Sequence, residues 1–227
     1  MLKIDKDNYY FIPNHNKNGL NLYSIENIFK DDFEIMVKFK VDWDKYGEKT
    51  PVGGVVAKNG KHMGIFSKKD WQGTTRFYNI VAKIWTTHNG IDTLKEMSCE
   101  VGKYDMENDV EEMDETSFIY DCTLTHDKNS KKFIFTCNHI AQEYVYEGDI
   151  CDYGQNMFWY GCGMGFGEEW NEHFYGTLYE SYVSIKGGFK VFESDFKKYT
   201  QYKVFDKSWN GNHLVKFDQI GFTEWQN

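Results

Sequence analysis

Proline and arginine are nearly absent from this chain of 227 residues, which has 2 prolines and a single arginine, Arg76. Turns must therefore depend on the 20 glycines and on asparagine and aspartate. No run approaches the ~18 consecutive apolar residues of a membrane-spanning helix. The N-terminus has no apolar stretch of signal-peptide type. We expect no membrane insertion, and synthesis in the cytoplasm without a signal peptide.

Cysteine is present in a number and spacing that exclude two common uses. The chain has 5 cysteines, an odd number, and no Cys-x-x-Cys pair. This pattern favours neither a zinc site nor a full disulfide framework. We predict no metal site of fixed spacing. Calcium is the one cation that we keep open, because aspartate and glutamate oxygens in loops suit it.

The charge is negative, with a formal net charge of −9 and a pI near 5.3. Such a chain repels phosphate backbones and anionic membranes, so we predict that it binds no nucleic acid. Net charge of this size also simply keeps a domain soluble. Lysine, asparagine, aspartate and tyrosine are abundant, which is the bias of an AT-rich genome such as those of many phages and viruses.

Aromatic residues make up 18% of the chain and indicate a fold rich in strands. Residues 33–43 alternate apolar and polar side chains, the pattern of a long half-buried strand. Further strands are predicted at 53–57, 62–67 and 77–87, with a tight turn at Asn59-Gly60. The acidic stretch 94–115 lacks clear periodicity, and we interpret most of it as a solvated loop or short helix.

The best-defined unit is a hairpin over residues 117–138. If Cys122 opposes Cys137, then Leu124 opposes Phe135 and one face is apolar while the other is polar. This register places two thiols side by side. They could form a disulfide in an oxidising environment, and two buried free thiols are the expectation for a cytosolic product.

The C-terminal third continues the pattern of strands. Strands are predicted over 157–163 and 174–186, the second with large side chains on both faces and therefore central. Residues 187–227 are aromatic and charged, and we expect a short helix around 193–198 with further edge strands. No repeat or linker divides the chain, so we predict one domain over 1–227, with its core at about 30–186 and a C-terminal extension that completes or decorates it.

These segments, in this order, resemble the concanavalin A-like lectin/glucanase superfamily in its laminin-G-like form. The resemblance lies in the strand at 33–41, the pair 54–60 and 63–66, the hairpin 117–139 and the ending from Tyr160-Gly161 to Val183. It implies an all-β, antiparallel jelly-roll β-sandwich. Phe118 stands where the family has a tryptophan, so the resemblance supports the fold better than any inherited site.

No catalytic set is visible. Retaining glycosidases of this superfamily carry Glu-x-Asp-x-Glu on one strand, but counting from Glu112 the third position is Thr116. Polysaccharide lyases of this fold need arginine, histidine and tyrosine on neighbouring strands. Nothing in the spacing unites Arg76 with the candidates for such a set: His62, His139, Tyr78 and Tyr120. The glycine-rich run 161–167 lacks the Lys-Ser/Thr of a phosphate loop. We predict no enzymatic activity.

Two polar loops contain a tryptophan and are our candidate glycan sites. Exposed aromatic rings stack on sugars, while neighbouring carboxylates and amides bind hydroxyl groups. The alternative is that each tryptophan folds back as a lid on the sandwich edge. The candidate residues of the first loop are Asp70, Trp71 and Gln72, and those of the second are Glu169, Trp170, Asn171 and His173.

The leading hypothesis is a non-catalytic recognition or structural module with a lectin-like fold that binds a glycan or a protein surface. A virion surface component of a phage or virus, as capsid decoration or fibre-associated protein, fits the composition, but this rests on analogy. One alternative is a carbohydrate-active enzyme, a glycosidase or polysaccharide lyase, with an unrecognised site. Another is an oligomeric structural subunit without glycan affinity, which binds other virion proteins or its own copies. The ligand and the oligomeric state do not follow from the sequence.

Overall fold

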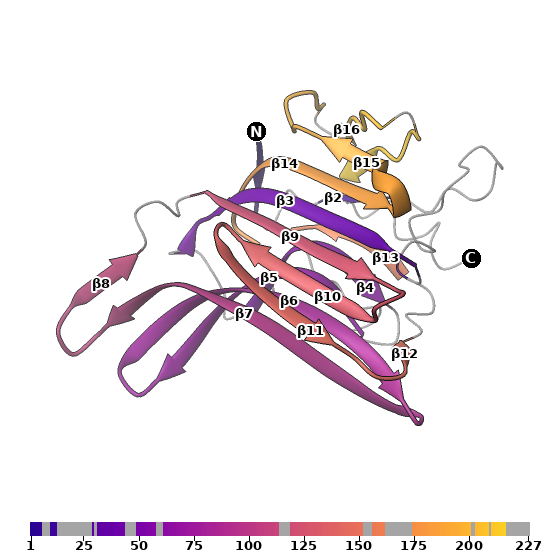
Figure 1. The fold of residues 1–227 in the computed structure, drawn as a ribbon. Helices are drawn as coiled ribbons and strands as arrows, with labels where there is room; N and C mark the ends of the chain where they lie inside the picture. Colours follow the sequence, from indigo (N-terminus) through magenta and orange to yellow (C-terminus); the bar gives the residue numbers. More distant parts are fainter. Residues whose placement is uncertain are drawn as a thin grey trace.

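Two antiparallel β-sheets lie face to face in the computed structural model (Figure 1). The structure describes residues 1–5, 10–12, 29, 31–43, 49–57, 61–113, 119–151, 156–161, 174–200, 203–208 and 210–216. The prediction of an all-β, antiparallel sandwich is confirmed. No helix among these residues is long and apolar enough to cross a bilayer.

The small sheet has seven strands, and β14 lies next to the edge that β1 and β15 form. On one side β14 pairs with β3, and on the other side β1 and β15 pair with its two halves. The order across the sheet is β1 (Leu2–Ile4), β14 (Gly176–Ile185), β3 (Phe33–Val41), β9 (Tyr120–Asp127), β10 (Lys132–Cys137) and β11 (Ile140–Val145), with β15 (Phe189–Ser194) beside β14.

The large sheet has ten strands and contains the two longest ones, β6 and β7. Its order is β16 (Lys203–Val204), β17 (Leu214–Lys216), β2 (Tyr10–Ile12), β13 (Asn156–Tyr160), β4 (Lys49–Ala57), β5 (Met63–Gln72), β6 (Thr75–His88), β7 (Ile91–Asp105) and β8 (Val110–Met113), with β12 (Asp149–Ile150) pairing with β6. A three-residue 3-10 turn, η4 (Lys186–Gly188), joins β14 to β15.

The core lies between the two sheets and follows the alternation read from the sequence. In β3, the odd-numbered residues from Phe33 to Val41 are buried, and the even-numbered ones point outward. In the hairpin of β9 and β10, Cys122 pairs with Cys137 and Leu124 with Phe135, so the predicted register is confirmed. Both cysteines are free and buried, and burial raises the pKa of Cys122 above that of an ordinary thiol.

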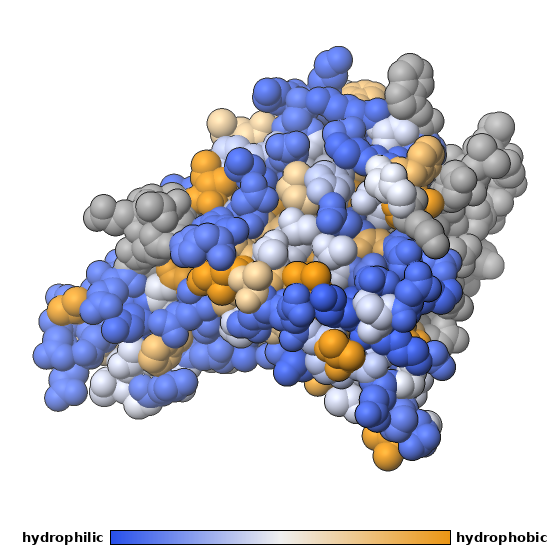
Figure 2. All heavy atoms as spheres, in the orientation of Figure 1, coloured by the Kyte–Doolittle hydropathy of each residue, from blue (hydrophilic) through white to orange (hydrophobic). Residues whose placement is uncertain are grey.

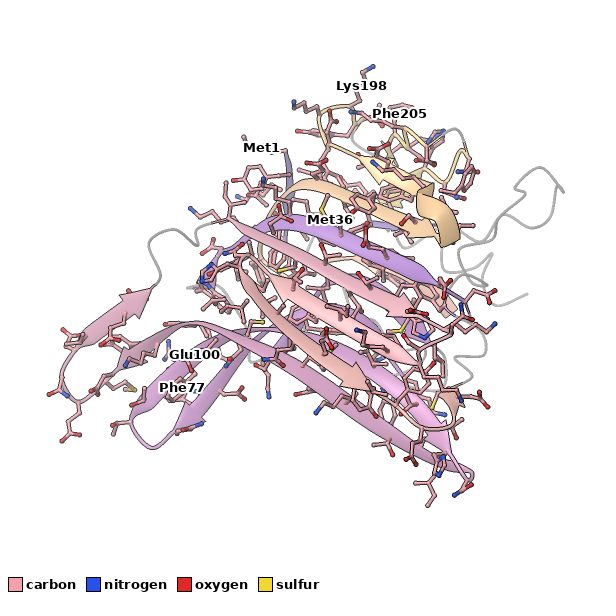
Figure 3. The ribbon with its side chains drawn as sticks, viewed as in Figure 1. Met1, Met36, Phe77, Glu100, Lys198 and Phe205 are labelled. Carbon is pink, nitrogen blue, oxygen red and sulfur yellow. The ribbon has the colours of Figure 1, made fainter. Side chains whose placement is uncertain are left out.

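The outer face of the small sheet is mostly hydrophilic, with hydrophobic residues scattered over it (Figure 2). Met36 points outward from the middle of β3 (Figure 3). Beside it, Glu34 accepts hydrogen bonds from the Tyr182 hydroxyl at 2.5 Å and from Thr125 Oγ1 at 3.2 Å. These bonds join β14 and β9 to β3 and leave the Glu34 carboxylate without a free oxygen.

Two predicted elements are wrong. Over 94–113, the described part of the stretch 94–115, most residues are in strands, because β7 runs to Asp105 and the chain returns as β8. The alternation of Met97, Cys99 and Val101 with polar residues carries β7 across the core. No helix forms at 193–198, because β15 continues to Ser194 and hydrogen-bonds β14. The C-terminal residues contribute β15 to the small sheet, and β16 and β17 to the large one.

A buried histidine, His126, lies near the end of β9 in the small sheet. His126 is 1% exposed, and its two ring nitrogens lie 2.7 Å from the Asp31 carbonyl oxygen and 3.0 Å from the Tyr146 hydroxyl. The carbonyl must accept, so Nδ1 carries the proton and Nε2 accepts from Tyr146. Burial lowers the pKa of His126, although Asp31 opposes that effect.

We therefore expect stability to fall in mild acid because of His126. The unfolded chain protonates this imidazole near pH 6.5, while the folded chain resists protonation to a lower pH. The contribution is fully present above pH ~6.5 and is lost below it by at most about 1.4 kcal/mol per pH unit. Urea unfolding between pH 7.5 and 5 should show a shallower pH dependence for His126→Gln than for the wild type. Parallel curves would contradict this assignment.

Candidate functional site

The first candidate loop is the end of a strand. Asp70, Trp71 and Gln72 are the last residues of β5, and cross-strand pairing continues to Gln72 opposite Thr75. The turn itself is only Gly73-Thr74. The expectation of a polar loop is wrong at this position. Because side chains alternate along a strand, Asp70 and Trp71 point to opposite faces of the large sheet.

These residues belong to a part of the large sheet that extends past the edge of the small one (Figure 1). We call this part the arm. It comprises residues 69–72 of β5, 75–77 of β6, 102–105 of β7 and all of β8. Phe77 marks it in Figure 3. The arm presents a sheet surface that no strand of the small sheet covers.

One row of side chains crosses the arm on the face that continues from the core. Trp71 pairs with Arg76, Arg76 with Tyr104, and Tyr104 with Glu111. The Arg76 Cζ atom lies 4.4 Å from the centroid of the Trp71 ring and 5.9 Å from that of Tyr104. Trp71 is 45% exposed. The row therefore combines an open aromatic surface with a cation.

Tyr104 is held in place by a hydrogen bond to the turn between β7 and β8. Its hydroxyl donates a hydrogen bond to Asp109 Oδ1 at 2.7 Å, and that bond raises the pKa of the tyrosine. The phenol thus stays neutral around pH 7. Its bond to Asp109 ties the turn between β7 and β8 to the ring that contacts Arg76.

The opposite face of the same strands carries a network of charged and amide groups. The Lys68 ammonium lies 3.1 Å from Asp70 and 3.2 Å from Glu96. The Asn79 amide donates to Asp70 at 3.3 Å and accepts from Ser98 at 3.1 Å. Burial lowers the pKa of Lys68, but its hydrogen bonds with the two carboxylates outweigh burial and raise that pKa. This network links β5, β6 and β7, and its groups satisfy one another.

Two solved structures of carbohydrate-binding proteins share this architecture. The module CBM40 of the Ruminococcus gnavus IT-sialidase, bound to α2,3-sialyllactose, matches with a TM-score of 0.50 and 11% identity over 81% of this chain and 89% of that one. A putative carbohydrate-binding protein from Bacteroides ovatus matches with a TM-score of 0.51 and 12% identity over 95% of this chain. This chain has the concanavalin A-like jelly-roll fold.

Other comparisons add little to that identification. The chain spans 57% of the length of the Bacteroides protein. An alginate lyase from Pseudomonas aeruginosa matches with a TM-score of 0.36 and 10% identity over 69% of this chain and 66% of that one, which is too low to support an argument. No protein-family model and no curated protein matches the chain. At these identities the concanavalin A-like fold is what the likeness shows.

The residues considered for catalysis lie apart in this jelly roll. Glu112 is in the arm, where its carboxylate lies 2.9 Å from the Lys103 ammonium. Tyr78 and Tyr120 are buried core residues on either side of Trp43, whose indole donates to the Tyr120 hydroxyl at 3.2 Å. Within the ranges that the structure describes, no group of three or more histidine, cysteine, aspartate or glutamate residues could hold a metal ion.

The second candidate site is not described by the structure. Its residues Glu169, Trp170, Asn171 and His173 all lie within 162–173, outside the described ranges. Sequence reasoning missed Arg76 and Tyr104 as neighbours of Trp71. The two-residue turn Gly73-Thr74 was the available signal, because a hairpin centred there pairs Trp71 with Arg76.

Proposed function

We propose that this protein is a non-catalytic module that binds a glycan, and that the sugar stacks on Trp71 in the arm. The observation that carries the proposal is the exposed indole, at 45%, on a sheet surface held by four paired strands. An aromatic ring fixed on a rigid strand offers a stacking surface with little conformational entropy to lose. The exposed side chain of Gln72, like that of Asp70, points to the opposite face of the strand, so its glycan-binding role stays a prediction for that face.

The likeness to carbohydrate-binding proteins agrees with this proposal at the level of the fold. Asp70 points away from Trp71, so one sugar ring stacked on the indole cannot also contact the Asp70 carboxylate. The glycan-binding role of Asp70 stays a prediction for the opposite face, as the role of the 169–173 segment stays a prediction for the undescribed loop. Variants separate these surfaces.

On a glycan array, the wild type should bind a defined set of glycans, and Trp71→Ala should lose that binding. Burying an indole against a ligand contributes about 1.5–3 kcal/mol, so affinity should fall about tenfold or more. Phe189→Ala is the matched control, because Phe189 is 47% exposed and lies in β15, outside the arm. It should bind as the wild type does.

Two further variants test which surface of the protein binds the sugar. Asp70→Asn should keep glycan binding if the sugar lies on the Trp71 face, and lose it if the sugar lies on the opposite face. Trp170→Ala should leave binding unchanged if the arm is the site. Incubation of each bound glycan with the wild type should release no shorter product. Cleavage abolished by a single carboxylate substitution would replace this proposal with the carbohydrate-active enzyme.

A location on a virion surface is a finer part of the proposal. It is supported by the AT-biased composition and by the acidic β-sandwich without a recognised catalytic set. An antibody raised against the chain should label intact particles of the source virus or phage. If particles carry the chain but the purified protein binds no glycan, the oligomeric structural subunit becomes the better account, and sedimentation should then show self-assembly.

A further inference from the structure

Resting on the proposed function, we propose that the ligand at the Trp71 site is an acidic saccharide whose carboxylate binds the guanidinium of Arg76. Arg76 is the only arginine among 227 residues, in a chain where lysine otherwise supplies the positive charge. It lies in the middle of the arm, on the same face as Trp71 and in the same row.

The packing of Arg76 fixes its position without using its N–H groups. A guanidinium is planar, and its N–H groups point outward in that plane, whereas contacts with aromatic rings use its faces. Arg76 Cζ lies over the Trp71 ring at 4.4 Å, with the Tyr104 ring at 5.9 Å. The hydrogen bond from Tyr104 to Asp109 in turn holds that phenol. The cation is therefore pre-organised.

The N–H groups of Arg76 are unused within the described part of the chain. There, Arg76 forms no ion pair, and its Nε is buried without a hydrogen-bond partner. The two terminal nitrogens are not among the buried atoms that lack partners, so their N–H groups reach solvent. A charged fork that is fixed on one side and open on the other is ready to bind an anion from solution.

Three acidic side chains in or next to the arm have other partners, whereas Glu111 is separated from Arg76 by Tyr104 in the row. Asp70 contacts Lys68 and Asn79, Asp109 accepts from Tyr104, and Glu112 pairs with Lys103. The chain has 35 acidic and 26 basic residues, so an arginine without an acidic partner among the described residues is unexpected on charge alone. The arm supplies neighbours for the faces of the guanidinium and none for its edge.

A carboxylated sugar fits this site better than a neutral sugar or a dense polyanion. The two oxygens of a carboxylate match the spacing of two parallel N–H groups, and the bond is charge-assisted. The open part of the Trp71 indole accepts the apolar face of a sugar ring. The exposed acidic residues of the β7–β8 turn and of β8 repel a chain of closely spaced sulfates. Those residues are Glu107, Asp109, Glu111 and Glu112.

The test compares each acidic glycan with its own neutral form. Trigalacturonate and α2,3-sialyllactose are titrated calorimetrically beside their methyl esters, which keep the sugar rings and remove the negative charge. The wild type should bind at least one acid about tenfold or more tightly than its ester, the size expected for a charge-assisted hydrogen-bonded pair. Arg76→Lys keeps the charge but loses the planar fork, and should reduce that ratio to about threefold or less.

Controls separate binding from folding. Phe189→Ala, which changes an exposed aromatic residue of β15 outside the arm, should leave the acid-to-ester ratio unchanged. If Arg76→Lys does not fold, the wild type alone still tests the inference. Its acid-to-ester affinity ratio should decline between 50 and 500 mM salt by an amount on the order of the loss expected for one ion pair. A heparin-derived oligosaccharide serves as the sulfated probe and should bind more weakly than the preferred carboxylated one.

Each outcome has a defined meaning. Equal binding of acid and ester that is lost in Trp71→Ala overturns this inference and leaves the proposed function standing. A preference for the acid that survives Arg76→Lys and Arg76→Gln overturns the role of Arg76. Tighter binding of the sulfated probe than of the carboxylated one overturns the inference that a carboxylate is the group that Arg76 binds. Failure to bind any glycan, acidic or neutral, on the array or by calorimetry overturns the proposed function and this inference with it.

Discussion

Gly64→Ala is expected to destabilise the protein by at least about 3 kcal/mol and to leave little soluble product. Gly64 lies in β5 with a φ of +144°, a conformation that side chains rarely adopt. A Cβ atom there would lie 2.5 Å from the Gly53 carbonyl oxygen and 2.5 Å from the Gly54 Cα. Both atoms belong to the backbone of β4, so the two strands would have to separate at the centre of the large sheet.

Gly73→Ala is the matched control for this prediction. Gly73 also has a positive φ, at +62°, but no atom lies within 4 Å of the position its Cβ would occupy. Its substitution should therefore cost only the conformational term, about 1 kcal/mol. Urea unfolding of both variants measures the difference. An equal loss in the two would show that backbone conformation, and not the close approach of β4 and β5, requires the glycine.

Asp206→Ala is expected to release the C-terminal residues from the sandwich and to lower the free energy of unfolding by about 3 kcal/mol or more. The Asp206 carboxylate accepts four hydrogen bonds. The donors are the backbone N–H groups of Glu193, Ser208 and Asn212, and the Ser208 hydroxyl, at 2.8–3.0 Å. The Glu193 N–H group belongs to β15 in the small sheet, and the other donors belong to residues 208 and 212. A single carboxylate therefore ties the segment that follows Asp206 to β15.

Asp206→Asn tests whether the acceptors matter more than the shape. An amide keeps one acceptor oxygen and replaces the other with a donor, so about half of the loss should remain. Urea unfolding, with limited proteolysis followed by mass spectrometry, measures both stability and release. Cleavage after residue 194 should speed up in Asp206→Ala. Unchanged proteolysis together with unchanged stability would mean that β16 and β17 are held by other contacts.

The elements that the sequence predicts well are those in which one face is fully buried. In β3, the apolar residues at odd-numbered positions alternate along the whole strand and lie in the core, while Met36 is the one apolar residue on the outer face. In the hairpin of β9 and β10, a one-residue slip would separate Leu124 from the face of Phe133 and Phe135, and the structure has the predicted register, which keeps them together. A strand buried on one face shows a local alternation of apolar and polar residues, which can be recognised without knowing the rest of the fold.

The strand β7 was missed because its ends leave the core. The first five residues, 91–95, are exposed on both faces, and the last four, 102–105, lie in the arm. Only Met97, Cys99 and Val101 record the alternation, and acidic residues surround them. Their strand conformation comes from pairing along the whole of β6, and a local pattern does not reveal such pairing.

The sequence allowed one residue of the candidate site, Trp71, to be predicted, but not the residues that surround it. Trp71 stood out as an aromatic residue in a polar stretch. Its contacts with Arg76 and, through it, Tyr104 depend on the position of the turn at 73–74 and on the pairing of β6 with β7. The separation of Asp70 from Trp71 follows from strand alternation, once the segment is known to be a strand.

The most direct test of the account is fluorine NMR of protein labelled with 5-fluorotryptophan. The chain has 7 tryptophans, and the resonance that disappears in Trp71→Phe identifies Trp71. On titration with a glycan selected by the array, we predict that this resonance shifts in a saturable manner while the others stay within their linewidths. A saturable shift of a different tryptophan, with the Trp71 resonance unmoved, would contradict the placement of the site in the arm.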